Sequence, residues 1–429
     1  MNLKVLIISP YFPIFNAADM QRIRMSMSYF NQYGWDAEVV SVDPEYLDFP
    51  KDELLIESLP ADTKIHYVKA FHKRWTSKIG LGSIALRALL FYLLKVNQLL
   101  KKQKFDLIYF STTQFPLCIL GAYWKKRFNI PYVIDMQDPW HSDYYQDKPK
   151  AQQPPKYWFS YRINKYLEPL AMNHADGLIS VSADYINILK LRYSRVRHIP
   201  HAVITFGAFQ KDFDTAKKNQ HLFKPLLSSD FINIVYIGRG GYDMHKAITP
   251  LIRGLKSGLK IDPLKFSRVR LHFIGTSYAA EGQGKQTILP LAKQYGVEDY
   301  VVEITNRISY FHTLVTLQNA DALFIPGSDD PKYTASKIYP YLSANKITLA
   351  IFNSHSPAME VLKEYGVKHS YHYDNPALDH KVNLFLNEVS GKEIPEISYN
   401  ASAVDKYSAK NMTLHQCALF NEVLAARSN

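Results

Sequence analysis

Residues 232–246 read INIVYIGRGGYDMHK, and this stretch decides the fold. The mainly apolar run Ile232–Ile237, in which Asn233 is the one polar residue, is typical of a strand that is buried on both faces of a parallel sheet. A loop with Gly238 and Gly240 follows it, and Arg239 and Lys246 supply two cations. The backbone of such a loop can approach a diphosphate closely, with arginine as a planar fork and lysine as a point charge. The third glycine of the loop, Gly241, comes too early for the spacing G-x-G-x-x-G, so a dinucleotide-binding fingerprint is not supported.

The alternation of apolar runs and helical patterns extends in both directions from this stretch. It predicts an α/β protein of two facing doubly wound (Rossmann-like) domains, with the ligand site in the cleft between them. We expect a first domain over 1–205, a linker over 206–230 and a second domain over 231–404. The apolar runs predict strands at 5–8, 37–42, 105–110, 132–135, 177–182, 232–237, 269–274, 301–304, 322–325 and 348–352.

The composition favours an anionic partner. A formal net charge of +12 suits a phosphorylated small molecule, an acidic phospholipid surface or nucleic acid. Neither zinc-finger spacing nor an RNA-binding signature accompanies the basic residues, so we do not expect nucleic acid. The start MNLKVLIISP lacks signal-peptide features, and no apolar run is long enough to span a bilayer. With Cys118 and Cys417 as the only cysteines, expected to be reduced, these features predict a cytoplasmic protein.

A second loop with chemical potential reads FIPGSDDPKYTASK, residues 324–337. Thr334 and Ser336 are good N-cap residues, so we expect a helix to begin there with its free N–H groups directed at an anion. Lys337 would add positive charge. The adjacent Asp329 and Asp330 could hold sugar hydroxyls, and an acidic turn without a ligand is the equal alternative.

Two loops of the first domain are candidates for an acceptor site. Asn16, Asp19 and Arg22 lie in and after the loop that follows the first strand, although an ordinary strand–helix connection explains that loop equally well. Asp138 follows another strand and could orient an acceptor hydroxyl or take its proton, with His141 as the second candidate. Because the nearest acid, Asp135, does not form a D-x-D pair with it, we expect no essential metal.

Together these stretches resemble a known family. IPYVIDMQDPW, IVYIGRGGYDMHKAI and NADALFIPGSDDPKYTASKIYPYLSANKITLAIF are similar, in order and spacing, to glycosyltransferases of the GT-B fold, most closely the retaining family-4 type. The resemblance implies a hexosyltransferase that uses a nucleotide sugar, with UDP-sugar favoured, and a glycan or lipid-linked acceptor in bacterial surface polysaccharide assembly. It also implies that the last helix, 405–429, crosses back onto the first domain. The donor-binding residues expected on this basis are Gly238, Arg239, Gly240, Lys246, Asn306, Arg307, Tyr333, Thr334, Ser336 and Lys337.

One departure from the family pattern affects donor recognition. The family has two glutamates eight residues apart near the Thr334 helix, and this chain has Pro340 where the second would hold the donor ribose. Proline inside a helix bends it or shifts its start. Two alternatives therefore stay open beside sugar transfer: a nucleotide-sugar epimerase on the same fold, and a non-catalytic partner protein that resembles a glycosyltransferase.

A basic and aromatic segment of the first domain predicts contact with a membrane surface. Residues 71–75 read FHKRW, Lys78 follows, and an apolar helix is expected from Ile84. Cations and tryptophan suit the headgroup layer of an anionic membrane. We expect the apolar helix itself to pack on the sheet, while the segment before it places the protein peripherally on the inner face of the membrane.

Overall fold

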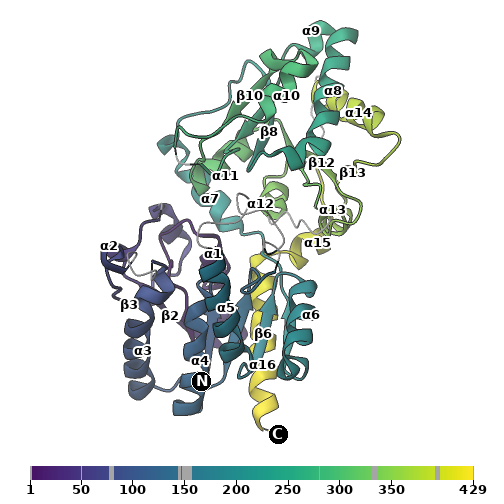
Figure 1. Ribbon diagram of the computed structural model, residues 1–429. Helices are drawn as coiled ribbons and strands as arrows, with labels where there is room; N and C mark the ends of the chain where they lie inside the picture. Colours follow the sequence, from purple (N-terminus) through teal and green to yellow (C-terminus); the bar gives the residue numbers. More distant parts are fainter. Residues whose placement is uncertain are drawn as a thin grey trace. The chain divides into compact units, whose positions relative to one another are not determined.

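The structure is a computed structural model, and it describes residues 2–49, 51–76, 82–143, 146, 157–279, 281–330, 337–391 and 397–428. The chain divides into two compact units, one formed by Met1–Gly207 with Ser408–Asn429 and the other by Ala208–Tyr407. Each unit contains a single sheet whose paired strands all run parallel (Figure 1). No helix among the described residues is both long enough and apolar enough to cross a membrane.

The first unit is built on a seven-stranded sheet in the order β3-β2-β1-β4-β5-β6-β7. The order reverses between β1 and β4, which is the point where doubly wound sheets bind ligands. β4 and β5 lie in the middle and every residue of each is buried, as their continuous apolar sequences predict. The strands are β1 Leu3–Ile8, β2 Trp35–Val42, β3 Lys64–Val68, β4 Leu107–Ser111, β5 Tyr132–Met136, β6 Gly177–Ser180 and β7 His201–Val203.

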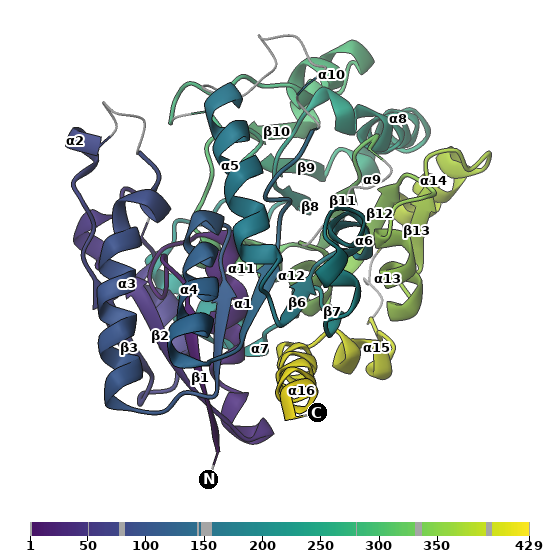
Figure 2. The same ribbon diagram turned by 60° about the horizontal axis from the view of Figure 1, so that its bottom comes forward.

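Helices cover both faces of this sheet because its crossovers run in opposite directions from the centre. With right-handed crossovers, the helix between β1 and β2 lies on one face, and those that lead towards β7 lie on the other. Accordingly α1 packs against α16, whereas on the other face α4 lies between α3 and α5 (Figure 2). The helices are α1 Ala18–Ser26, α2 Lys73–Thr76, α3 Ile84–Lys102, α4 Ile119–Phe128, α5 Tyr157–Met172, α6 Ala183–Arg192 and α16 Ala409–Ser428.

The second unit has a six-stranded sheet in the order β10-β9-β8-β11-β12-β13, again with its reversal at the centre. The strands are β8 Ile232–Ile237, β9 Val269–Ile274, β10 Val301–Ile304, β11 Ala322–Pro326, β12 Ile347–Phe352 and β13 His369–His372. The helices are α7 Gln210–Lys218, α8 His245–Ile261, α9 Pro263–Phe266, α10 Ile288–Tyr295, α11 Tyr310–Asn319, α12 Ile338–Ser343, α13 Ala358–Tyr365, α14 Leu378–Val389 and α15 Ala401–Lys406.

The structure confirms the predicted fold class and adds elements that the sequence did not indicate. The predicted linker 206–230 contains α7, which packs on α11 inside the second unit. The edge strands β3, β7 and β13 were not predicted. Pro340 lies in the first turn of α12. Backbone N–H groups in a first turn have no acceptor within the helix, so a proline there removes no hydrogen bond. Among the described residues α12 begins at Ile338, and it accommodates the proline without a break inside it.

Candidate functional site

The glycine loop of the second unit follows β8 at the carboxyl edge of its sheet, as predicted. A Cβ atom on Gly238 would lie 1.9 Å from Nζ of Lys337, so the lysine ammonium rests directly on the glycine backbone. Nζ also donates a hydrogen bond of 3.2 Å to the hydroxyl of Tyr236 and lies 5.0 Å from the centre of that ring. Only glycine at 238 permits this approach, which joins the two predicted loops at one point.

Lys337 is an incompletely compensated cation. Its side chain is half-buried, and within the described part of the chain no carboxylate forms an ion pair with it. Removal of water from the ammonium, helped by the positive charges of Arg239 and Arg307, lowers the pKa of Lys337 to about 8. Three cations from three different loops thus act on the same place, and a polyanion bound there would stabilise all of them.

Arg239 is oriented by a carboxylate on its own loop. Both of its terminal nitrogens donate to Asp243, at 2.8 and 2.6 Å, and the hydroxyl of Ser328 donates to the same carboxylate at 2.7 Å. Burial opposes ionisation of Asp243, but these hydrogen bonds outweigh it and lower the pKa of its carboxyl. The pair fixes the guanidinium at the carboxyl end of β8 and links the glycine loop to the end of β11.

Lys246 lies in the first turn of α8 and lines a cavity of about 510 Å³ together with Arg253 and Tyr373. Its ammonium is 5.9 Å from the centre of the Tyr373 ring, whose hydroxyl donates to the carbonyl of Ser328 at 3.0 Å. The lysine is thereby connected, through one tyrosine, to the segment that holds Asp243. Its side chain and that of Arg239 nevertheless have separate surroundings.

The remaining predicted donor-side residues lie around this edge or outside the described residues. Arg307 stacks 5.2 Å from the ring centre of Tyr278, and the side-chain oxygen of Asn306 accepts from the backbone N–H of Gly282 at 3.1 Å. Asp329 and Asp330 follow β11 and are both exposed. The structure does not describe 331–336, so the predicted roles of Tyr333, Thr334 and Ser336 fall outside it, and α12 begins at Ile338.

The candidate acceptor loop of the first unit follows β5. The side chain of Asp138 is exposed, yet removal of water by the surrounding protein and the nearby charge of Asp19 raise the pKa of its carboxyl. His141 is turned inward: its backbone N–H donates to Glu168 at 2.9 Å, and its ring lies 4.7 Å from that of Tyr161. Burial, followed by the charge of Arg192, lowers the pKa of His141, which keeps its imidazole neutral.

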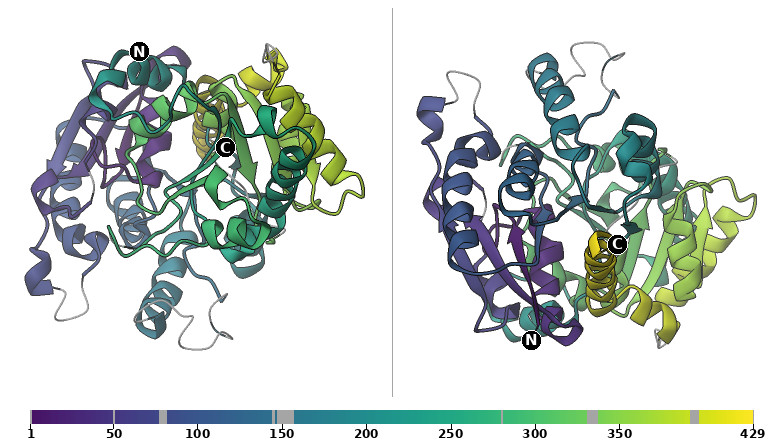
Figure 3. Two further views of the ribbon diagram at one scale, coloured as in Figure 1. Left: turned by 90° about the horizontal axis from the view of Figure 1, so that it is seen from above. Right: turned by 90° about the horizontal axis from the view of Figure 1, so that it is seen from below.

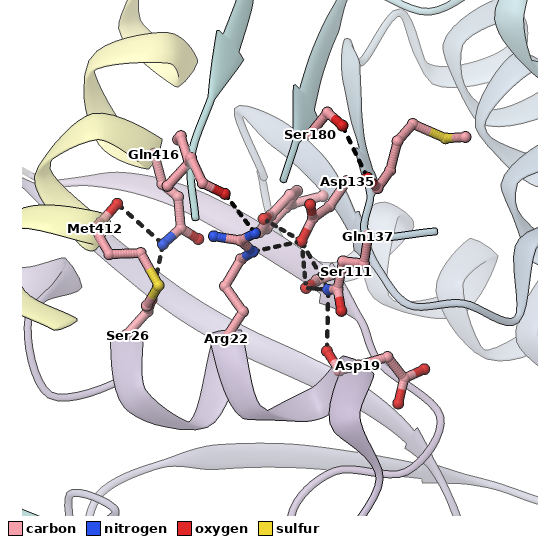
Figure 4. Close-up of polar contacts among 12 residues, drawn as sticks. Asp19, Arg22, Ser26, Ser111, Asp135, Gln137, Ser180, Met412 and Gln416 are labelled. Carbon is pink, nitrogen blue, oxygen red and sulfur yellow. Dashed lines mark hydrogen bonds and ion pairs between the residues drawn. The ribbon is translucent and has the colours of Figure 1, made fainter. Parts of the chain in front are cut away.

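Arg22 corrects an expectation. Its side chain is fully buried, and Nε donates to Asp135 at 2.7 Å while the two terminal nitrogens donate to the carbonyls of Thr205 and Ile204 at 3.1 and 2.8 Å (Figure 4). An arginine with this set of internal partners holds α1 to β5 and to the end of the first unit. Its predicted contact with an acceptor is therefore wrong.

Asp19 has a similar structural task. One carboxylate oxygen accepts from the hydroxyls of Thr112 and Thr113, at 2.9 and 3.2 Å, and from the backbone N–H of Thr113 at 3.0 Å. Burial raises the pKa of this carboxyl above its usual range. Asp19 thus fixes the loop after β4 rather than contacting an acceptor directly, and Asn16 is the half-buried member of the predicted set that precedes α1.

The residues that the sequence did not single out are the partners of the predicted ones. Asp243 lies four positions after Arg239, a spacing at which a helical turn brings opposite charges together. Tyr236, inside the predicted strand, supplies both a ring and a hydroxyl to Lys337. Nothing in the local sequence marks either residue as part of a site.

The comparisons with known proteins bear on the same architecture. Residues 39–205 match the model of Glycosyltransferase Family 4. The match covers less than half of the chain, so it shows a similarity of the first unit to this family. No curated protein matches the chain in sequence. The match lies in the first unit, supports a nucleotide-sugar-dependent glycosyltransferase, and favours it over the epimerase alternative.

Solved structures at low sequence identity share the two-domain GT-B fold of this chain. One is a sucrose-phosphate synthase from Thermosynechococcus elongatus, 14% identical, with TM-score 0.56 and coverage of 99% of this chain and 100% of the other. Another is S. aureus TarM with UDP, α-GlcNAc-glycerol and fondaparinux, 11% identical, with TM-score 0.55 and coverage of 98% and 100%. The lipopolysaccharide outer core galactosyltransferase WaaB in its apo form is 14% identical, with TM-score 0.52 and coverage of 99% and 100%.

Proposed function

We propose that this glycosyltransferase binds the diphosphate of a nucleotide sugar, with UDP-sugar favoured, at the carboxyl edge of its second sheet. The observation that supports this best is the Lys337 ammonium, which lies against the backbone of Gly238 and whose pKa is lowered by burial and by the nearby charges of Arg239 and Arg307. A lysine that forms no ion pair with a carboxylate of the described residues, close to two arginines, suits a ligand that carries at least two negative charges. Lys246, in the first turn of α8, contributes from the adjoining cavity.

The proposed reaction is retaining transfer of a hexosyl group to a glycan or lipid-linked acceptor. As the glycosidic bond to the diphosphate breaks, negative charge develops on the leaving oxygen, and the fixed cations of the second unit stabilise it. Asp138, with its raised pKa, orients the acceptor hydroxyl or takes its proton. Asp329 and Asp330, exposed after β11, are the proposed contacts to the sugar hydroxyls.

The remaining assignments of the proposal rest on the family resemblance for the base and on N-cap chemistry for the phosphate. Asn306 and Arg307 would meet the base, and Tyr333, Thr334 and Ser336 would complete the phosphate site. We propose no metal, because the cations of the chain supply the positive charge that the diphosphate needs. The proposed setting is the assembly of bacterial surface polysaccharide at the inner face of the membrane.

Calorimetric titration with UDP and with uridine tests the donor site. In Arg239→Ala and Lys246→Ala, we expect UDP affinity to fall roughly 10- to 100-fold, since each change removes a charge-assisted contact. Uridine affinity should change little. Lys260→Ala removes a cation at the other end of α8 and serves as the control. Unchanged UDP affinity in both site variants would overturn the assignment.

A further inference from the structure

Two tryptophans of the first unit are unusually exposed. Trp75 in α2 shows 63% of its surface and Trp158 in the first turn of α5 shows 64%, although tryptophan is normally largely buried. Phe71, just before α2, is 48% exposed as well. Exposed apolar side chains that gather on one face of a domain mark contact surfaces, whereas single ones are ordinary.

Each of the two tryptophan rings has an arginine guanidinium close to its face. The guanidinium of Arg74 lies 5.1 Å from the ring centre of Trp75, and that of Arg162 lies 5.7 Å from the ring centre of Trp158. We define the docking face as Phe71, Arg74, Trp75, Trp158 and Arg162. The same arrangement of a flat apolar ring beneath a planar cation occurs twice, on segments more than eighty residues apart in the printed sequence.

Both halves of the docking face lie at the same edge of the sheet. The segment with Trp75 follows the carboxyl end of β3, and the segment before α5 follows the carboxyl end of β5; these strands belong to one parallel sheet. Figure 3 shows α2 and the amino-terminal end of α5 projecting to the same side of the first unit. Asp138 also follows β5, so the face adjoins the candidate acceptor loop.

The charges beside the rings are mainly positive. Exposed Lys69 precedes the first half, and exposed Lys165 follows the second by one helical turn. The acids of these segments are engaged, because Asp48 forms an ion pair with Lys73 at 3.1 Å and Asp143 accepts from Tyr161 at 2.7 Å. Among the described residues of the two segments, the free surface therefore combines cations with aromatic rings.

We propose that the docking face binds the surface of an anionic lipid bilayer, with both tryptophans in the headgroup layer. Tryptophan prefers the membrane–water interface, and each cation near an anionic surface adds to binding. A second copy of the chain is a poorer occupant, since two such faces would bring like charges together. The inference rests on the proposed function for its purpose: it would bring a lipid-linked acceptor to Asp138.

The predicted segment 71–78 is thus only half of the surface. Lys78 lies outside the described residues, and the second half, on α5, was not anticipated from the sequence. The structure also gives α3 the role expected of it, because Ala85, Ala88, Tyr92 and Val96 are fully buried against the first unit. The helix supports the docking face from within and does not itself enter the bilayer in this proposal.

Vesicle sedimentation of the full chain tests the proposal. Vesicles of phosphatidylcholine alone and with one quarter phosphatidylglycerol are compared at low and high salt. We expect binding only to anionic vesicles at low salt, with the partition coefficient lowered on the order of tenfold in Trp75→Ala/Trp158→Ala. Arg74→Ser and Arg162→Ser should each lower it about fivefold. Leu264→Ala and Arg268→Ser change exposed residues of the second unit and serve as matched controls.

Three results would overturn the docking face. They are failure of the wild type to bind anionic vesicles, equal binding by wild type and the double tryptophan variant, and conversion of a dimer to a monomer by that variant. UDP affinity, measured in parallel, separates this proposal from the donor site. Loss of vesicle binding with normal UDP affinity isolates the docking face, whereas vesicle binding without UDP affinity would reject only the proposed function.

Discussion

Arg22 in the first unit and Lys337 in the second are both cations, but they differ in how deeply they are buried and in which groups they contact. This difference separates a charge that stabilises the fold from one that is suited to binding a ligand. Arg22 is fully buried, and its guanidinium donates to Asp135 and two backbone carbonyls. Lys337 is half-buried, and its ammonium donates to a tyrosine hydroxyl; removal of water, and after it the charges of two arginines, lowers its pKa. The first charge is compensated by the protein itself. The second is held ready for a negative group that the described residues do not supply.

The surroundings of the two cations extend this contrast. Asp135 also accepts from Ser111 at 3.2 Å and Gln137 at 2.8 Å, and Gln416 of α16 donates to Ser26 at 2.8 Å (Figure 4). These contacts tie α1, β4, β5 and α16 into one buried polar centre. Around Lys337 the polar groups come instead from loops at a sheet edge, where a ligand can reach them.

Breaking the compensated pair should have the largest effect on stability. Asp135→Ala leaves the Arg22 charge buried without its counter-ion, so we expect the free energy of unfolding to fall by about 3–5 kcal/mol. Urea denaturation followed by tryptophan fluorescence measures this. Asp48→Ala breaks the exposed pair with Lys73 and should cost at most about 1 kcal/mol. Equal losses in the two variants would contradict the contrast.

In the first unit we expect catalysis to depend on the exposed Asp138 after β5 and not on the buried pair of Arg22 and Asp135. In Asp138→Asn we expect the transfer rate to fall on the order of 100-fold, because the amide cannot accept a proton from the acceptor. UDP affinity should stay within twofold on this argument, since the cations assigned to the donor belong to the other unit. A steady-state transfer assay with parallel UDP titration separates the two quantities. A parallel fall in both would remove Asp138 from the acceptor side.

Removing the charge of Lys337 should lower ligand affinity and leave stability intact, the opposite of breaking the pair of Arg22 and Asp135. Lys337→Met keeps the apolar stem and deletes the charge, so UDP affinity should fall roughly 10- to 100-fold while the unfolding free energy is unchanged or higher. Arg22→Met is the matched variant, and it should lose stability because Asp135 is then left without its cation. If Lys337→Met unfolds as readily as Arg22→Met, the distinction between the two cations fails.

The sequence predicted most of the strands because their apolar runs are continuous. β8 has the predicted bounds, 232–237, and β5 extends the predicted 132–135 by one residue, since these inner strands of parallel sheets are buried and mainly apolar. β3 and β13 were missed because edge strands are half-exposed and read as KIHYV and HSYH. α5 was missed because exposed aromatic residues interrupt its periodicity.

Site residues could be predicted where they are adjacent in sequence, but contacts between distant segments could not. The glycine loop and its cations were found because they are adjacent in sequence to a strand end. The role of Arg22 was not, because Asp135 lies 113 residues away and nothing near the arginine announces it. The contact between Gly238 and Lys337 likewise joins two loops through the fold. Which charges are compensated is therefore a property of tertiary structure.

The smallest expected effect, and the most specific, is the pH dependence of donor binding. The pKa of Lys337 is about 8 in place of its usual 10.5, so the free enzyme loses this charge as pH rises through 8. A diphosphate needs the charged form, and UDP affinity should therefore fall about tenfold between pH 7 and pH 9.

The free energy of unfolding should rise with pH between about pH 8 and 10.5, where UDP affinity falls. Because the folded-state pKa of Lys337 is depressed, the unfolded chain binds more protons between pH 8 and 10.5, and the contribution of this residue to stability rises with pH there. Lys337→Arg keeps its charge throughout and should bind UDP with a flatter pH profile than the wild type. Calorimetric titration of both proteins in matched buffers distinguishes these cases. If the arginine variant shows the same tenfold decline, another group titrates, and the comparison between the two cations would have to rest on the variants alone.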